Sequence, residues 1–169
     1  GKAKEFYEIY ELYEKGLHQH NLIDFSDMLN LVLKTIDYDD ELLAEISSGF
    51  KYILVDEYQD TNSGQNELIF NIARGAKTNN VFVVGDDDQI IYSFQGARCD
   101  NLKTFLKKYP ETKVICLNEN NRSSQLILDF AEDIIKNDKS RLSNDPEFKL
   151  HNIDKKLIAK NDKVIQKEE

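Results

Sequence analysis

Two adjacent carboxylates, Asp56 and Glu57, follow a short apolar run in the segment YILVDEYQDTN, residues 52–62. A short apolar run between polar residues predicts a strand that is buried on both faces in a parallel sheet. Ligands of open α/β sheets bind at the carboxyl ends of the strands, so both acids are predicted to face a ligand crevice. There Asp56 can hold Mg²⁺, directly or through water, and Glu57 can orient and deprotonate an attacking water. The pair suits nucleotide hydrolysis, and the alternative is an acidic loop that only solvates the surface.

A second β-branched run, residues 81–84, ends in the same way, at Gly85 followed by three aspartates and Gln89. The pattern predicts a buried strand, a tight turn at the glycine and polar groups at the carboxyl edge of the sheet. Tyr92 and Phe94 follow shortly afterwards. Aromatic rings beside such a site can stack on unpaired bases, each stack contributing about 1–3 kcal/mol, or they can fill the core.

A third apolar run, residues 113–117, is predicted to be another buried strand of the same sheet. Ser123 or Ser124 can cap the helix that follows it. Arg122 then lies between the carboxyl end of a strand and the start of a helix. A guanidinium at that position can bind a phosphate through two parallel hydrogen bonds.

Helical spacing of apolar residues predicts the elements that position these loops. The segment 4–18 is predicted to be an amphipathic helix whose aromatic residues pack into the core. Asp24 is predicted to cap the next helix, with Asp27 three residues later. Further helices are predicted at residues 25–36, 39–46, 65–74 and 101–109. After residue 136 the pattern weakens and predicts a linker, with at most a strand near residues 157–158.

The composition limits the class of protein. With 169 residues, 40% of them hydrophobic, the chain can form one compact core. Its net charge of -9, from 22 basic and 31 acidic residues, opposes nucleic-acid binding through a broad basic surface. This net charge is still compatible with a motor that binds a nucleic-acid strand through a few residues. The sequence has no apolar run of about 18 residues and no secretory leader, so a soluble, cytoplasmic protein is expected. Cys99 and Cys116 lack zinc-ligand spacing, and Cys116, inside an apolar run, is expected to be a buried free thiol.

Three segments, in this order, closely resemble motifs of superfamily 1 helicases of the UvrD/Rep/PcrA type. They are DEYQDTN at 56–62, VGDDDQIIYSFQGA at 84–97 and LNENNRSS at 117–124. DFSDML at 24–29 is similar to a family segment shortly before the first motif, so the resemblance covers about residues 5–135. It implies an α/β fold: a partial RecA-like parallel sheet of the P-loop NTPase type, flanked by helices, with an adjoining N-terminal helical piece.

The resemblance also implies a division of the chain into three parts. Residues 1–48 are expected to form a helical segment at the end of an inserted subdomain. Residues 49–136 are expected to be the C-terminal part of a first RecA-like ATPase domain, and residues 137–169 a linker into a second. The sequence contains no GxxxxGK[ST] phosphate loop. The chain is therefore expected to be an internal piece of a longer helicase, and residues 1–169 alone are expected to be inactive.

Roles at the nucleotide site follow from the resemblance, position by position. Asp56 looks like the Mg²⁺-associated acid and Glu57 like the catalytic base. Gln89 is similar to the glutamine that senses the γ-phosphate of ATP and couples it to the DNA site. Arg122 resembles the arginine that stabilises transition-state charge on that phosphate.

Roles at the DNA site are implied in the same way. Phe94 occupies the place of an aromatic residue that stacks on a base of the single strand, and Tyr92 is expected along the same strand. Two positions depart from the family pattern. Gln95 stands where the family commonly has an arginine that supports the DNA pocket. Asn121 replaces a tyrosine that stacks on adenine.

The function implied is that of an ATP-dependent DNA helicase, a hydrolase that uses ATP and Mg²⁺. Such a nucleotide-binding and DNA-binding motor translocates on single-stranded DNA, here expected in the 3′–5′ direction, and unwinds duplexes during DNA repair or replication. Single-stranded and partially duplex DNA are the expected partners, with possible repair or replication proteins. Two alternatives stay open: the motor of a RecB/AddA-like helicase-nuclease, and a non-catalytic interaction module derived from the fold.

Overall fold

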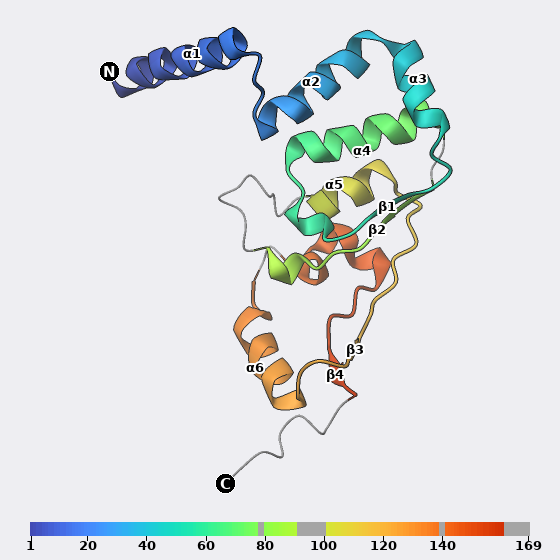
Figure 1. The fold of residues 1–169 in the computed structure, drawn as a ribbon. Helices are drawn as coiled ribbons and strands as arrows, with labels where there is room; N and C mark the ends of the chain where they lie inside the picture. The colour runs from blue at the N-terminus through green and yellow to red at the C-terminus, as the bar shows by residue number, and fades with distance from the viewer. Residues whose placement is uncertain (78–79, 91–100, 139–140, 161–169) are drawn as a thin grey trace. The chain divides into compact units, whose positions relative to one another are not determined.

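The computed structural model describes residues 1–77, 80–90, 101–138 and 141–160 (Figure 1). Its contacts divide the chain into two compact units. Unit 1 comprises residues 1–54 and 63–82, and unit 2 comprises residues 55–62 and 83–169. The fold is mixed α/β, with small parallel sheets and several helices. The three-part division predicted from the sequence remains a prediction.

The described part of unit 1 contains the helices α1 (Lys2–His20), α2 (Phe25–Tyr38), α3 (Asp40–Ser48) and α4 (Ser63–Gly75). The helices α2, α3 and α4 pack together around Leu33, Ile36 and Leu43 (Figure 1). The predicted cap of α2 is confirmed: the N–H of Asp27 donates to Asp24 Oδ1 at 2.8 Å, and the N–H of Asp24 donates to Asp27 Oδ2 at 3.1 Å. This reciprocal capping satisfies two N–H groups that a helix start leaves without partners.

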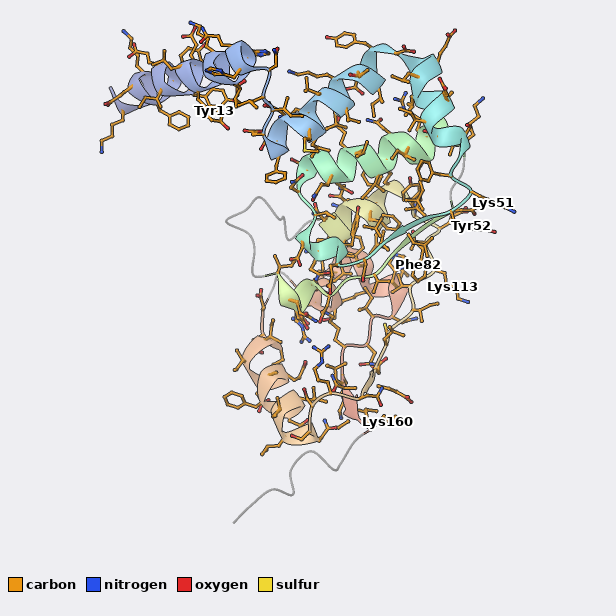
Figure 2. The ribbon with its side chains drawn as sticks, in the orientation of Figure 1. Tyr13, Lys51, Tyr52, Phe82, Lys113 and Lys160 are labelled. Atoms are coloured by element: carbon orange, nitrogen blue, oxygen red, sulfur yellow. The ribbon has the colours of Figure 1, made fainter. Side chains whose placement is uncertain are left out.

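The predicted burial of the aromatic residues of α1 is wrong. Helix α1 forms where the spacing predicted it, but none of its residues is buried. Phe6 is 71% exposed and Tyr10 is 51% exposed, and their rings stack on each other along the helix. Tyr13, labelled in Figure 2, instead donates from its hydroxyl to Asp24 Oδ2 at 3.0 Å. The apolar periodicity thus predicted the helix correctly, because periodicity indicates a face and not what covers that face.

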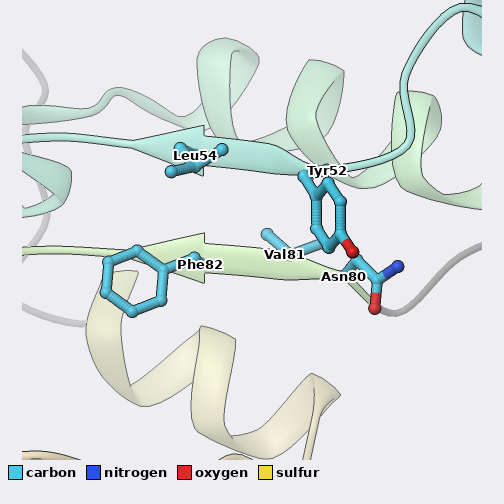
Figure 3. A pocket seen from close by; sticks show the side chains of 5 residues that line it. All are labelled: Tyr52, Leu54, Asn80, Val81 and Phe82. Atoms are coloured by element: carbon cyan, nitrogen blue, oxygen red, sulfur yellow. The ribbon is translucent and has the colours of Figure 1, made fainter.

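The two predicted strands at residues 52–55 and 81–84 are confirmed as β1 (Ile53–Val55) and β2 (Val81–Val83), which pair with each other. The N–H of Ile53 donates to the carbonyl of Asn80 and the N–H of Val84 to the carbonyl of Val55, so both strands run in the same direction. A hollow of about 530 Å³ lies on one face of this pair. Figure 3 shows the side chains that line it, those of Tyr52, Leu54, Asn80, Val81 and Phe82. This face is apolar and exposed, so the strands are not buried on both sides.

The elements of unit 2 include the helices α5 (Asn101–Lys108) and α6 (Gln125–Ile135) and short 3₁₀ helices at Leu142–Asn144 and Pro146–His151. Leu106 of α5 packs against Leu142 and Phe148 in a small apolar core. Residues after 136 therefore contribute core side chains, which their weak apolar pattern did not indicate. Among the described residues, no helix is long and apolar enough to span a membrane.

The predicted third buried strand at residues 113–117 is wrong. The chain there has no strand pairing among the described residues, and Ile115 and Leu117 are 65% and 78% exposed. The alternate side chains are half-buried, which is the pattern of an extended segment covered on one face. The strand β3 (Glu119–Asn120) begins later and pairs in parallel with β4 (Ile158–Ala159), close to the strand predicted near residues 157–158.

Candidate functional site

Asp56 and Glu57 leave the carboxyl end of β1, as the sequence predicted, and both are exposed. Asp56 Oδ1 accepts a hydrogen bond from the N–H of Glu57 at 2.9 Å. Glu57 has φ 48° and ψ 43°, in the left-handed region that favours glycine. This conformation starts the 3₁₀ helix Tyr58–Asp60 and turns the chain sharply as the strand ends. A glutamate held there carries a backbone strain of about 1 kcal/mol or more.

Gln59 joins this turn to the loop after β2. Its side chain is buried, with 2% exposed. Gln59 Nε2 donates to Glu57 Oε2 at 2.7 Å, and Gln59 Oε1 accepts from the N–H of Asp86 at 3.1 Å. The two loops meet closely at Gly85, where a Cβ would lie 2.8 Å from Gln59 Oε1. The expectation that polar groups from β1 and β2 meet at one edge of the sheet is confirmed at these residues.

Gln89 is connected to the same network. It ends the 3₁₀ helix Asp87–Gln89, and its Nε2 donates to Asp86 Oδ2 at 2.8 Å. Successive hydrogen bonds therefore run from Glu57 through Gln59 and Asp86 to Gln89. The structure thus links two of the residues that the sequence singled out.

The three aspartates after Gly85 are held by two basic residues from the C-terminal part of unit 2. Lys155 Nζ lies 2.7 Å from Asp86 Oδ1 and 3.1 Å from Asp88 Oδ2, and it also contacts Asp87. Burial alone would raise the pKa of Asp86, but hydrogen bonds from Lys155 and Gln89 outweigh it and lower this pKa. The acidic loop is therefore folded against cations of its own chain.

Arg141 is the second of these basic residues, and its side chain is 5% exposed. Its Nε and Nη2 donate to the two carboxylate oxygens of Asp88 at 2.9 Å and 2.8 Å. Its Nη1 and Nη2 donate to Glu132 of α6 at 3.0 Å and 2.9 Å. The hydrogen bonds that Arg141 donates to Glu132 and to Asp88 raise the pKa of Arg141, which keeps the guanidinium charged.

Arg122 lies between β3 and α6, close to where the sequence placed it, with its side chain exposed. Its backbone N–H donates to Asn120 Oδ1 at 2.9 Å. Within the described ranges its guanidinium contacts neither Glu57 nor Gln89. Ser124 occupies the predicted N-cap position of α6, but its hydroxyl does not cap the helix. The structure thus brings Glu57 and Gln89 together but not Arg122.

The predicted stacking residues Tyr92 and Phe94 lie outside the described residues, as does Gln95. Asn121, the second departure from the family pattern, is exposed. None of the residues predicted at the nucleotide site lines the hollow on the β1–β2 pair.

Among the residues that the structure describes, two groups of oxygens are chemically suited to a divalent cation. Ligand oxygens of Asp86, Asp87 and Asp88 lie within 4.8 Å of one another, but the ammonium of Lys155 already contacts all three carboxylates. Asp56 is exposed and uses one carboxylate oxygen in its turn. A single carboxylate with an oxygen facing solvent fits Mg²⁺, which keeps most of its waters and takes few protein ligands.

Three participants in this network were not assigned a role from the sequence. Gln59 stands within the first motif, two residues after Glu57, and that spacing was the available signal. Arg141 and Lys155 lie in a segment whose composition resembles a linker, 53 and 69 residues from the aspartates they bind. No local pattern marked them.

Comparison with known proteins identifies relatives. Residues 1–110 match the UvrD/REP helicase N-terminal domain family. The chain is 41% identical over 138 residues to the probable DNA helicase II homolog of Mycoplasma capricolum, covering 82% of this chain and 19% of that protein. It is 39% identical to the ATP-dependent DNA helicase PcrA of Staphylococcus aureus and 40% identical to that of Bacillus subtilis, covering 79% of this chain and 18% of each relative.

The chain therefore spans about a fifth of the length of these relatives. The match covers both loops of the hydrogen-bonded network, since residues 56–62 and 84–89 fall within 1–110. It extends over more than half of the chain. This chain belongs to the UvrD/REP helicase family.

Proposed function

We propose that this chain forms part of the ATP-hydrolysing core of a DNA helicase, with β1 and β2 as neighbouring strands of a RecA-like sheet. The observation that carries the proposal is the hydrogen-bonded chain from Glu57 to Gln89 at the carboxyl ends of two parallel strands. Catalytic carboxylates and residues that sense a bound phosphate are needed at that edge of an α/β sheet. The names of the relatives, ATP-dependent DNA helicases, support the same activity.

In this proposal each residue acts through a group that is accessible in the structure. Glu57 keeps Oε1 without a hydrogen-bond partner among the described residues, so this oxygen can accept a proton from water. Asp56 would hold Mg²⁺, which neutralises phosphate charge when it is bound. Gln89 would contact the γ-phosphate end of ATP. Arg122 would reach the same phosphate after a closing movement, because its exposed guanidinium has no contact with Glu57 within the described ranges.

DNA is the proposed polymer on which the motor acts. Tyr92 and Phe94 would stack on bases of a single strand, a contact that tolerates any sequence because every base has a π-face. Both residues follow Gln89 within five positions of the sequence, so a change at the nucleotide can reach the bound DNA strand through a short segment of chain. Movement in the 3′–5′ direction and a role in DNA repair or replication belong to the same proposal.

The test is single-strand-stimulated ATP hydrolysis by the full-length polypeptide, comparing wild type with Glu57→Gln. We expect DNA to accelerate hydrolysis and the substitution to lower kcat by about 10²–10⁴-fold while nucleotide binding persists. Glu45→Gln, at an exposed glutamate of α3, is the matched control and should leave kcat unchanged. Residues 1–169 alone should show no turnover. Absence of DNA-dependent hydrolysis in the intact wild type would refute the proposal.

A further inference from the structure

The orientation of the Gln59 carboxamide is fixed by its two partners. The carboxylate of Glu57 can only accept a hydrogen bond, so it must face the NH₂ group of Gln59. The N–H of Asp86 can only donate, so it must face the carboxamide oxygen. A side chain at this position therefore needs one donor and one acceptor, about as far apart as in an amide.

We propose that Gln59 is a positioning residue, which fixes the carboxylate of Glu57 for proton transfer and couples its orientation to the loop after β2. This inference rests on the proposed function. Gln59 occupies Oε2 of Glu57 and leaves Oε1 to the attacking water. Because Gln59 is 2% exposed, its carboxamide is shielded from solvent, whereas Glu57 itself is exposed. The left-handed turn at Glu57 brings its side chain back over the residue two positions later.

The same carboxamide carries displacement from Gln89 to the base. A pull on Gln89 moves Asp86, since Gln89 Nε2 donates to Asp86 Oδ2. The amide of Asp86 then moves the oxygen of Gln59, and the NH₂ group of Gln59 moves with it. The two loops approach closely at Gly85, where a Cβ would lie 3.3 Å from the backbone N of Gln59, so they have little room to move independently. Contact at Gln89 and the orientation of Glu57 are thereby coupled.

The first measurement compares Gln59→Met with Gln125→Met in the full-length polypeptide. Methionine keeps the length of the side chain but removes both hydrogen bonds. Gln125 is the matched control, because its Nε2 donates to Asp129 at 2.8 Å and its Oε1 accepts from the N–H of Ala159 at 2.9 Å, away from Glu57. We expect Gln59→Met to lower kcat by about 10²-fold, as for a base displaced by about 1 Å. Its Kd for nucleotide and the kcat of Gln125→Met should stay within about twofold of wild type.

The second measurement separates positioning from packing. The carboxyl introduced by Gln59→Glu would face Glu57, the N–H of Asp86, and the charges of Asp86 and Lys155 behind it. When protonated, it donates its O–H to Glu57 and accepts from Asp86, as the carboxamide does. Burial beside a carboxylate raises the pKa of such a group toward neutrality. The ratio of variant to wild-type kcat should therefore rise as the pH falls from about 8 to about 6, and the ratio for Gln59→Met should stay flat.

Each outcome has one consequence. A rising ratio for Gln59→Glu supports the inference, even if Gln59→Met fails to fold. A flat ratio makes Gln59 a packing residue and overturns the inference, as does a kcat of Gln59→Met equal to that of Gln125→Met. If the wild type shows DNA-dependent hydrolysis, the proposed function stands whether or not Gln59 proves to be a positioning residue. If the wild type is inactive, the proposed function and the role of Gln59 are both overturned.

Discussion

Substituting Arg141 by methionine tests whether the buried guanidinium holds unit 2 together. Methionine retains most of the apolar stem and removes the charge with its four hydrogen bonds to Asp88 and Glu132. The two carboxylates come from the loop after β2 and from α6, so the substitution removes one link from each of these elements to the segment that contains Arg141. The acidic partners are then left without this cation.

The expected cost follows from the burial of each partner. Breaking a fully buried ion pair costs about 3–5 kcal/mol, because the remaining charge stays desolvated. The side chain of Asp88 is 18% exposed and keeps Lys155 at 3.1 Å, so its share is smaller than that. The side chain of Glu132 is 40% exposed, so solvent limits its share to about 1 kcal/mol or less. We expect a total loss of about 2–3 kcal/mol in the free energy of unfolding.

Urea denaturation followed by circular dichroism measures this loss, since the sequence has no tryptophan to serve as a fluorescent probe. Lys136→Met is the matched control: Lys136 binds Asp133 at 2.7 Å, but their side chains are 51% and 69% exposed. It should cost about 0.5 kcal/mol or less, and high salt should abolish that cost. Equal losses for the two variants would refute the argument that burial makes the Arg141 contacts strong.

Four further perturbations have defined expectations. Gly75→Ala should destabilise unit 1 by about 1–3 kcal/mol in urea denaturation, because the new Cβ would lie 2.9 Å from a leucine side chain of α3. Gly16→Ala, in open space within α1, should instead raise helix content. Asn101→Ala should cost about 1–3 kcal/mol by the same assay, because it leaves a buried carbonyl without its donor. A hydrogen bond from Arg141 lowers the pKa of Glu132, and one from Lys103 lowers the pKa of Asp145. The ordinary pKa values of these two groups are 4.5 and 3.8. Above those values the two carboxylates contribute their full stabilisation to the fold, and this contribution is lost as the pH falls below them. Unfolding free energy measured against pH should decline there, and less steeply in Arg141→Met; a curve independent of pH would contradict this.

Local signals predicted the local structure well. Asp24 with Asp27 located the start of α2, and the apolar runs located β1 and β2 to within a residue or two. Both carboxylates of the first motif also left β1 where expected. These features depend on residues close in the sequence, where capping and strand patterning act.

Features that depend on distant residues were not predictable in the same way. The run 113–117 has the composition of a buried strand, but burial on both faces requires neighbours that its own sequence does not specify. Lys155 has the local surroundings of a solvated lysine, yet it is 69 residues from Asp86, which it binds. For α1 the prediction was wrong in another way: the apolar face of the helix was expected to be buried against other elements, but none of its residues is buried. Periodicity and composition do not indicate which distant residues will contact each other.

Because Glu57 has a positive φ, the residue that would make this turn most stable differs from the residue that the proposed activity needs. Glycine adopts this backbone conformation at no steric cost, whereas a residue with a Cβ gives up about 1–2 kcal/mol. Substituting Glu57 by glycine would therefore relax the turn and at the same time remove the carboxylate proposed as the base. A library screened only for heat resistance should enrich glycine at this position, and the thermostable clones that it yields should be catalytically dead.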